Sequence, residues 1–519
     1  MRTIRVGSAL ALCLGSISAA LSAADPASWV PARWDGGPLE LVRRTKGKAP
    51  ADARVRQIIA NWYDPATLAL LDGTPVNCLL VTFSAGAAPD VEAQQHKAVK
   101  EYARSASERG IRVLGIVYPG ADPLAVAVAA DEARLDGLVL DGVFPPEFGE
   151  KLRTAARSRS SGLLVIPIAR DAATLRTAKE PLLALEGTQP GARDLAEMGI
   201  RAGASAEPWI ESNIWLVRSL RLGTAWRPVW ISHPPNPSSE GDYVRSVADA
   251  AVGGGRWIVA LDDDLRVKLF HKDAAALETW HSISAYLQFA EDHAEWRSFA
   301  SFGNLAIIVD TAVKEASLAE EYLNLVARRQ VPYRLVPRSE LRAQSLAGFR
   351  AVLAGDLDTP TEPERKALRD FAEKGGLVLA GPWWGNPPKD EPYVEVPLGR
   401  GRVAIYKDDP PNPESLAKDI PDLLAPEVIG LSAFNVPTAI TYASTADCGK
   451  RVLVQLLNYA GRPIDRVTIR FKGSFRTARL YTPESALVEL ATEPAANGRT
   501  EVLIPKLAAW GALLLEDQN

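Results

Sequence analysis

The chain has 519 residues, which is enough for about three or four domains of typical size. Its composition, 47% hydrophobic and 24% charged, is that of an ordinary globular protein and excludes a disordered or fibrous chain. The formal net charge of -4 argues against nucleic acid or an anionic membrane as a general partner.

The N-terminus has the pattern of an export signal. A basic MRTIR is followed by the apolar stretch VGSALALCLGSISAAL and by the small residues of LSAADP, which predicts cleavage after Ala23 or Ala24. The apolar stretch is short for a membrane span, no second one follows, and Leu12 before Cys13 fits a lipoprotein site poorly. We therefore expect residues 1–24 to be a signal peptide, no membrane span, and a periplasmic or secreted mature protein.

Short aliphatic runs alternate with helical stretches over residues 36–298. Continuous aliphatic runs joined by crossover helices indicate a parallel sheet, and eight of them in this length predict a (β/α)8 TIM barrel. An open doubly wound sheet is the alternative, although the expected GxGxxG loop is absent. The eight predicted strands are Pro38–Val42, Asn77–Phe83, Ile111–Tyr118, Gly137–Asp141, Leu163–Ala169, Pro181–Glu186, Pro228–Ser232 and Arg256–Asp262.

Two smaller domains are expected after the barrel. The runs NLAIIVD, VPYRLVP, RAVLAGD and GGLVLAG, with helices between them, predict a small flavodoxin-like α/β domain over residues 302–408. Its candidate nucleophile elbow, LAGPWWG, has no cysteine, so an amidotransferase activity is not expected. The apolar period then changes to two, which predicts an antiparallel β-sandwich over residues 430–519.

Polar residues at the ends of the predicted barrel strands are the candidates for chemistry, because active sites of such barrels lie at the carboxyl ends of the strands. Most of these strand ends carry a carboxylate, and a carboxylate-lined mouth suits cleavage of glycosidic bonds. The candidates, in chain order, are Tyr118, Asp141, Asp171, Glu186, His233 and Asp262 to Asp264.

Each candidate also has a structural interpretation. Asp141 before Gly142 would shape a turn, and Glu186 before Gly187 would be a loop carboxylate. Asp171 and the Asp262 to Asp264 cluster would cap the helices that follow them. His233, which precedes two prolines, would be a hydrogen-bonded loop residue.

The stretch ASAEPWIESNIWLVRSL, which follows the sixth predicted strand, adds two candidates. Its tail has apolar residues at helical spacing and belongs to the core. Glu207 and Trp209 precede the first helical turn, where Trp209 would stack on a sugar and Glu207 would be a reserve acid/base. Helix capping and packing are the alternative for both residues.

Other kinds of chemistry find no support in the sequence. There is no GxSxG elbow and no phosphate-binding loop. The five histidines lack zinc spacing, and the Asp262 to Asp264 cluster lacks the spaced ligands of a calcium loop. We therefore expect neither a metal nor another cofactor.

The order of the predicted domains resembles that of the family 42 β-galactosidases. FRAVLAGDLDTPTEPERKALRDFAEKGGLVLAG is similar to the amidotransferase-like trimerisation domain of that family, which implies a homo-oligomer formed through the middle domain. The family has an Asn-Glu pair at the end of strand four and a Glu at strand seven. Here these places hold Leu140-Asp141-Gly142 and Ile231-Ser232-His233, so its catalytic residues do not carry over.

The barrel itself resembles bacterial hypothetical glycoside hydrolases and barrels of the α-galactosidase and polygalactosaminidase type. In those proteins an xDGxxLDG stretch at strand four supplies an Asp nucleophile, and LDGLVLDG, Leu135 to Gly142, is similar. The resemblance implies Asp141 as nucleophile and, from a later strand, Glu186 as acid/base.

The sequence thus predicts an exported glycoside hydrolase with Asp141 and Glu186 as its catalytic pair. Substrate binding is expected from Tyr118, Glu207, Trp209, His233, Asp262 and Asp263. The substrate would be an oligo- or polysaccharide. The competing prediction is a non-catalytic glycan-binding or assembly protein on the same barrel, and a structural oligomer is a third.

Overall fold

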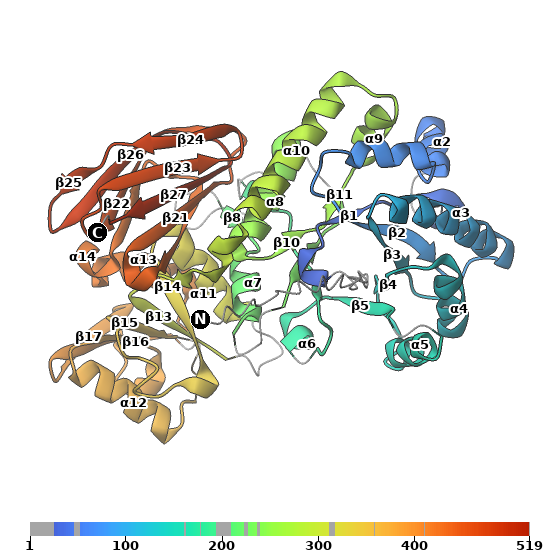
Figure 1. The fold of residues 1–519 in the computed structure, drawn as a ribbon. Coiled ribbons are helices and arrows are strands. Elements are labelled where there is room, and N and C mark those ends of the chain that lie inside the picture. The colour runs from blue at the N-terminus through green and yellow to red at the C-terminus, as the bar shows by residue number, and fades with distance from the viewer. Residues whose placement is uncertain are drawn as a thin grey trace, which may run out of the picture.

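The computed structural model describes residues 25–45, 52–159, 162–176, 178–193, 209–222, 227–235, 239–310, 317–355, 357, 359–408 and 411–517. The predicted signal peptide therefore lies outside the described residues. Three parts are visible: a barrel, an α/β domain and a β-sandwich (Figure 1). Among the described residues, no helix is long and apolar enough to cross a membrane.

The first part is a closed parallel barrel of eight strand positions. The strands pair in the order β10-β9-β6-β5-β4-β3-β2-β1-β11. Since β10 and β11 are separated only by Ile258, they form one interrupted eighth strand that closes the ring between β9 and β1, and the open-sheet alternative is wrong. The strands are β1 Pro31–Arg33, β2 Cys78–Ser84, β3 Arg112–Val117, β4 Gly137–Leu140, β5 Leu164–Ala169, β6 Leu183–Glu186, β9 Val229–Ser232, β10 Arg256–Trp257 and β11 Val259–Ala260.

The first predicted strand is wrong. Residues Gly37–Thr45 form helix α1, in which Glu40 bonds Arg43 and Arg44 at helical spacing. The true first strand, β1, has only three residues, too few for a periodic signal, and it begins before residue 36. The other seven predicted strands are confirmed in their order, so the numbering of barrel strands four and six is unchanged.

The pairing register fixes how the barrel strands are staggered. Starting at Ala32, we follow the paired residues from strand to strand around the barrel to the eighth strand. The position reached there lies eight residues from Val259, the residue with which Ala32 pairs directly when the ring closes. A displacement of eight over eight strands is the shear of a (β/α)8 barrel. Positions at one level of the barrel therefore advance by one residue per strand.

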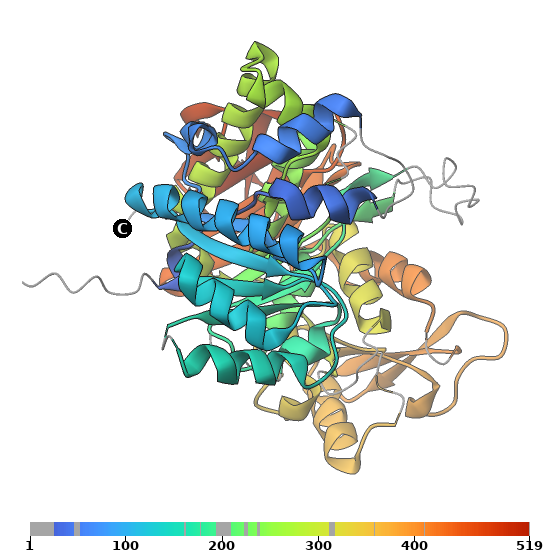
Figure 2. The ribbon, with the colours of Figure 1, turned by 90° about the vertical axis from the view of Figure 1, so that its right-hand side faces the viewer.

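Alternate residues of each strand fill the barrel interior. Because side chains of a strand alternate between its two faces, the other residues face the helices. The interior cluster takes one or more residues from each of barrel strands two to eight: Cys78, Leu80, Leu114, Ile116, Tyr118, Val139, Ile166, Ala184, Trp230 and Ile258. The outer face of the sheet is covered by helices such as α3 (Pro89–Glu108), α4 (Pro123–Ala133) and α5 (Phe148–Arg157), which lie side by side (Figure 2).

Three of the remaining barrel helices lie on the side that faces the other two parts. Helices α8 and α10 pack on each other, and α8 also contacts strand β21 of the sandwich (Figure 1). The helices are α2 Ala53–Asn61, α6 Ala172–Arg176, α7 Ile214–Leu220, α8 Glu240–Gly253, α9 Asp263–Phe270 and α10 Ala274–Asp292. A short hairpin of β7 (Gly191–Arg193) and β8 (Trp209–Glu211) follows the sixth barrel strand.

The middle part is the expected flavodoxin-like α/β domain. Strands β13 (Leu305–Val309), β14 (Tyr333–Pro337), β15 (Ala351–Ala354) and β16 (Leu377–Ala380) are parallel. A hairpin of β17 (Tyr393–Leu398) and β18 (Gly401–Tyr406), which the sequence analysis missed, extends the sheet beside β16. Its helices are α11 Ser317–Arg328, α12 Glu362–Glu373, α13 Pro413–Leu423 and α14 Pro426–Ile429.

The middle domain extends beyond residue 408. Helix α13 packs on α11, and its apolar face joins the same core as β13 and β15. The core of the domain therefore continues to Ile429.

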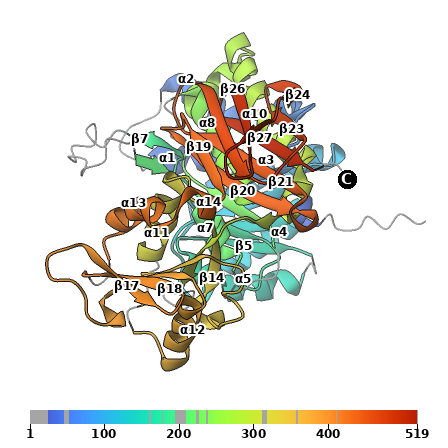
Figure 3. The ribbon, with the colours of Figure 1, turned by 90° about the vertical axis from the view of Figure 1, so that its left-hand side faces the viewer.

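The third part is the expected antiparallel β-sandwich. It lies above the middle domain in Figure 3. Strand β12, which follows the last barrel helix in the chain, joins the sandwich by pairing with β20. One sheet has the order β12-β20-β21-β27-β23-β24 and the other β19-β22-β26-β25. The strands are β12 Ala300–Ser301, β19 Leu431–Phe434, β20 Ala439–Ala446, β21 Arg451–Asn458, β22 Ile464–Lys472, β23 Thr477–Thr482, β24 Ser485–Leu490, β25 Glu493–Ala495, β26 Arg499–Leu507 and β27 Trp510–Glu516.

A buried carboxylate joins the barrel to the sandwich. Asp249 on α8 accepts hydrogen bonds from the Ser212 hydroxyl (2.6 Å), the Tyr459 hydroxyl (2.7 Å) and the Asn213 backbone N–H (2.8 Å). Burial raises the pKa of Asp249, against the opposing effect of these hydrogen bonds. Because Tyr459 follows β21, the contact fixes the sandwich against α8.

We expect Asp249→Ala to destabilise the protein by about 2–4 kcal/mol, because it leaves several buried donors without an acceptor. Urea denaturation measures the loss. Asp422→Ala, at an exposed position of α13, is the matched control and should change stability little. Equal stability of Asp249→Ala and the wild type would contradict this role.

Candidate active site at the barrel mouth

Asp141 and Glu186 lie at one level of the barrel and face its interior. Leu140 pairs with Pro167, and the next residue of β5, Ile168, pairs with Ala184. An advance of one residue per strand then brings Asp141 level with Glu186. Val139 and Ala184, two residues earlier on the same strands, belong to the interior cluster, so both carboxylates point inward at the carboxyl end.

The turn after β4 explains why a glycine follows the carboxylate. The backbone N–H of Asp141 still bonds to Val117 O, at 3.0 Å, and the chain then turns at Gly142 with φ of 131°. A Cβ atom on Gly142 would lie 2.7 Å from Cγ of Pro119. Only glycine fits this turn, which makes Asp141 the last inward side chain of its strand.

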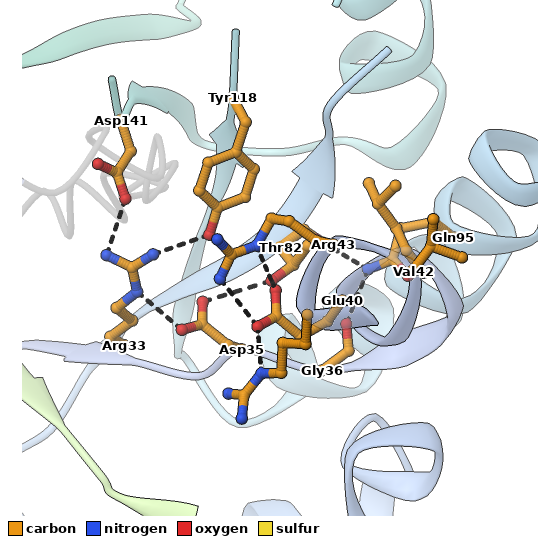
Figure 4. Close-up of polar contacts among 12 residues, drawn as sticks. Arg33, Asp35, Gly36, Glu40, Val42, Arg43, Thr82, Gln95, Tyr118 and Asp141 are labelled. Carbon is orange, nitrogen blue, oxygen red and sulfur yellow. Dashed lines mark hydrogen bonds and ion pairs between the residues drawn. The ribbon is translucent and has the colours of Figure 1, made fainter. Parts of the chain in front are cut away.

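Arg33 holds Asp141 in place. Its Nη1 lies 2.9 Å from Oδ2 of Asp141, its Nε lies 2.8 Å from Oδ2 of Asp35, and its Nη2 donates to the Tyr118 hydroxyl at 2.7 Å (Figure 4). The side chain of Arg33 is 13% exposed and that of Asp141 is 28% exposed. One guanidinium thus joins barrel strands one, three and four beneath the open end of the barrel.

A buried polar network supports Arg33 from the side of α1. Glu40, whose side chain is fully buried, bonds Arg43 and Arg44 and accepts from the Thr82 hydroxyl at 3.0 Å (Figure 4). Thr82 also donates to Asp35, at 3.3 Å. Although burial opposes the charge, Arg33 and then Arg266 lower the pKa of Asp35.

Glu186 has a looser partner. Its Oε2 lies 3.3 Å from Nε of Arg170, and the two side chains are 47% and 63% exposed. An exposed ion pair of this kind contributes at most about 1 kcal/mol and is easily exchanged for water or ligand. The two carboxylates therefore differ: Asp141 is held firmly, and Glu186 is accessible.

Tyr118 belongs to the same site as Asp141. Its hydroxyl accepts from Arg33, and the guanidinium of Arg43 lies 4.3 Å from its ring centroid. Burial and the charge of Asp35 raise the pKa of Tyr118. Its ring is buried, so Asp141, Glu186 and Arg170 present the substantial polar surface among these groups.

The aspartates after the eighth barrel strand are engaged by neighbours. Asp262 caps α9, with Oδ1 accepting from the Leu265 N–H at 3.0 Å and Oδ2 from the Tyr243 hydroxyl at 2.6 Å. Asp263 forms an ion pair with Arg44 at 2.6 Å. The capping alternative applies to Asp262, and substrate binding by either residue stays a prediction.

The other candidates lie apart from the Arg33 contacts. Asp171 caps α6 through the Thr174 N–H, at 2.7 Å. Nδ1 of His233 lies 2.7 Å from Pro234 O. Trp209 packs against the middle domain, with Arg328 5.0 Å from its ring, and Glu207 lies outside the described residues.

The arginines of the site are not predicted from the sequence. Arg33 and Asp35 alternate around Trp34, which is the period of a strand, but the run is too short to stand out. Arg170 follows a predicted strand directly, and this position was the available signal. In the described parts of the chain, no three His, Cys, Asp or Glu side chains gather as metal ligands would.

No protein-family model matches the chain, and no curated protein does. Solved structures do match. An α-L-fucosidase from Paenibacillus thiaminolyticus has a TM-score of 0.56 and 11% identity, covering 95% of this chain and 100% of that one. A β-galactosidase from Bacillus circulans sp. alkalophilus has a TM-score of 0.57 and 8% identity, and the match covers 95% of this chain and 99% of that one. A GH42 β-galactosidase from G. stearothermophilus has a TM-score of 0.52 and 9% identity, and the match covers 95% of this chain and 99% of that one.

These similarities extend over all three parts of the chain. At such low identity they show the fold alone. The protein therefore has a glycoside hydrolase-like TIM barrel with the domain architecture of the GH42 β-galactosidases, as the resemblance implied.

Glu92 gives the mouth a pH-sensitive support. It accepts from the Ser84 hydroxyl (2.7 Å) and from the backbone N–H groups of Ala85 and Ala87 (both 2.9 Å), and so shapes the loop after β2. Burial opposes its charge, but His96, whose Nε2 lies 3.4 Å from Oε2, and these hydrogen bonds lower the pKa of Glu92 from 4.5 to about 2.

We expect Glu92→Gln to lower the free energy of unfolding at pH 7 by about 1–3 kcal/mol. Because the pKa of Glu92 is lower in the folded state, its stabilisation is complete above pH 4.5 and is lost as the pH falls towards 2. The difference between wild type and variant should therefore shrink at pH 3 in urea denaturation. Glu101→Gln, exposed on the same helix, is the control; a difference that does not change with pH would contradict the assignment.

Proposed function

We propose that the protein is an exported glycoside hydrolase that cleaves an oligo- or polysaccharide with Asp141 and Glu186. The observation that carries the proposal is that these two carboxylates are level, inward-facing and open to solvent at the carboxyl end of the barrel. Two barrel strands apart corresponds to roughly 9–10 Å between strand axes. Side chains that converge from that spacing can face each other across a glycosidic bond.

The contacts of Asp141 suit the nucleophile or the base. Either role needs an ionised carboxylate in one fixed orientation, and Arg33 supplies a charged partner at 2.9 Å. In the reaction, Asp141 attacks the anomeric carbon or takes the proton of an attacking water. Positive charge develops on the sugar in the transition state, where the negative charge of Asp141 stabilises it.

The contacts of Glu186 suit the general acid. The acid must give its proton to the leaving oxygen, so it needs access to the substrate and freedom from a tight partner. A bound sugar can take the place of Arg170, because the ion pair between Arg170 and Glu186 is exposed and weak. After Glu186 has given its proton to the leaving oxygen, its carboxylate pairs with Arg170 again.

The second candidate function is glycan binding without catalysis. It is favoured by the end of the seventh barrel strand, where Ser232 and His233 stand and no carboxylate does. A barrel that had lost its chemistry would keep the polar mouth and would bind a sugar without cleaving it.

Export and association of copies through the middle domain stay proposals; N-terminal sequencing of the secreted protein and sedimentation would test them.

We expect Asp141→Asn to reduce turnover by at least about a thousandfold and to leave folding intact. The assay is hydrolysis by the mature protein across a panel of aryl glycosides and polysaccharides. Asp264→Asn, an exposed carboxylate on α9 paired with Lys268, is the control and should keep full activity. Turnover that survives in Asp141→Asn would remove this residue from the mechanism.

Glu186→Gln should separate the two roles. A substrate with a good leaving group, such as a dinitrophenyl glycoside, needs little help from an acid, so its turnover should fall far less than that of a natural linkage. An equal loss on both substrates would contradict the acid role. If no substrate is turned over but Asp141→Asn weakens binding of a glycan, the binding function replaces the hydrolase.

A further inference from the structure

A second cavity lies where the three domains meet. It measures about 430 Å³, which is within the usual range of small-molecule sites. Its walls come from α7, α8 and α10 of the barrel, from β14 of the middle domain and from β20, β21 and β27 of the sandwich (Figure 1). It shares no lining residue with the barrel mouth described above, so its ligand is independent of the proposed hydrolase site.

The cavity is strongly cationic. Arg218, Arg221, Arg297 and Arg334 line it, and among the described residues no aspartate or glutamate does. Glu291 lies outside the lining and pairs both with Arg297, at 2.9 Å, and with Arg256, at 2.7 Å, so it offsets the charge of Arg297 only in part. The remaining excess of positive charge is held in a partly enclosed space, where water screens it less than on an open surface.

Two of these arginines are fixed by neutral contacts. Arg218 lies between two aromatic rings, 4.4 Å from the centroid of Tyr333 and 4.8 Å from that of Tyr442, and it donates to Tyr333 O at 2.9 Å. Arg334 lies 3.9 Å from the ring of Phe349 and donates to Gly303 O at 2.9 Å. A guanidinium has five N–H donors, so each contact orients the group and leaves donors for a ligand.

Two of the lining arginines repel each other. Burial and then the charge of Arg297 lower the pKa of Arg221 to about 10. An anion between the arginines would remove this repulsion. Fixed, planar guanidinium groups are the groups that bind phosphate, sulfate and carboxylate oxygens with two parallel hydrogen bonds.

We propose that this junction cavity binds a small polyanion, whose phosphate, sulfate or carboxylate groups are held by Arg218, Arg221 and Arg334. The ligand is either a phosphorylated small molecule or the acidic end of a glycan. Because Arg334 belongs to the middle domain and Tyr442 to the sandwich, a bound anion stabilises the arrangement of all three domains.

Calorimetric titration of the mature protein at low ionic strength tests the proposal. The probes are pyrophosphate, for the phosphorylated source, and digalacturonate, for the acidic glycan, with lactose as the neutral control. We expect one of the two anions to bind and lactose not to bind at this cavity. Arg334→Gln should weaken the anion at least tenfold. Binding of neither anion would overturn the proposal.

The matched control is Arg365→Gln on α12. Arg365 has the same kinds of contact as Arg334, a backbone acceptor at 2.8 Å and an aromatic ring at 5.5 Å, but it does not line the cavity. It should leave anion binding unchanged. Equal weakening in both variants would show general charge attraction and overturn the site.

A second variant guards against misfolding of Arg334→Gln. Ala300 lines the cavity at an exposed position of β12, so Ala300→Glu adds a carboxylate there without removing a buried contact. This internal anion should compete with the ligand and abolish its binding. Undiminished binding in a folded Ala300→Glu protein would overturn the proposal.

Discussion

The pairing of β1 with both β2 and β11 is the contact on which the rest of the structure depends. A strand of only three residues closes the ring, and closure fixes the stagger of one residue per strand around the whole barrel. That stagger, with the alternation of side chains along each strand, decides which residues share a level. Asp141 and Glu186 lie at one level because of this geometry, although they are 45 positions apart in the sequence and a whole strand separates them in the barrel.

The same closing strand carries the charge that organises the mouth. Arg33 ends β1 and its guanidinium reaches strands three and four, so the strand that closes the ring also supplies the group that orients Asp141. Buried charges are costly unless they are paired, and here the pairing continues through Asp35 and Thr82 to Glu40. Helix α1 is thus required for the site, although it contributes no group to the open mouth.

The sequence predicted elements with a long periodic signal and missed the short ones. Seven barrel strands, the four parallel strands of the middle domain and the change of period in the sandwich all follow from apolar repeats. The first strand cannot be located from the sequence, because three residues have no period and the apolar residues of the adjacent α1 resemble a strand. Carboxylates at strand ends were visible in the same way. Their arginine partners were not predicted. Arg33 lies on a strand that is too short to be recognised, and Arg170, although it directly follows a predicted strand, pairs with Glu186 only once the two neighbouring strands are aligned.

The regular stagger also has a consequence for how such a protein can change. At the level of Asp141 the even-numbered barrel strands offer four equivalent inward positions, occupied by Thr82, Asp141, Glu186 and Ala260. Backbone pairing creates these positions, and no particular side chain is needed to maintain them. A single substitution at Ala260 would place a new functional group at the same level of the barrel as Asp141 and Glu186 without moving a strand. The side chains at these positions can therefore change while the architecture stays recognisable, as it does between this chain and solved structures that share only 11% and 8% of its sequence.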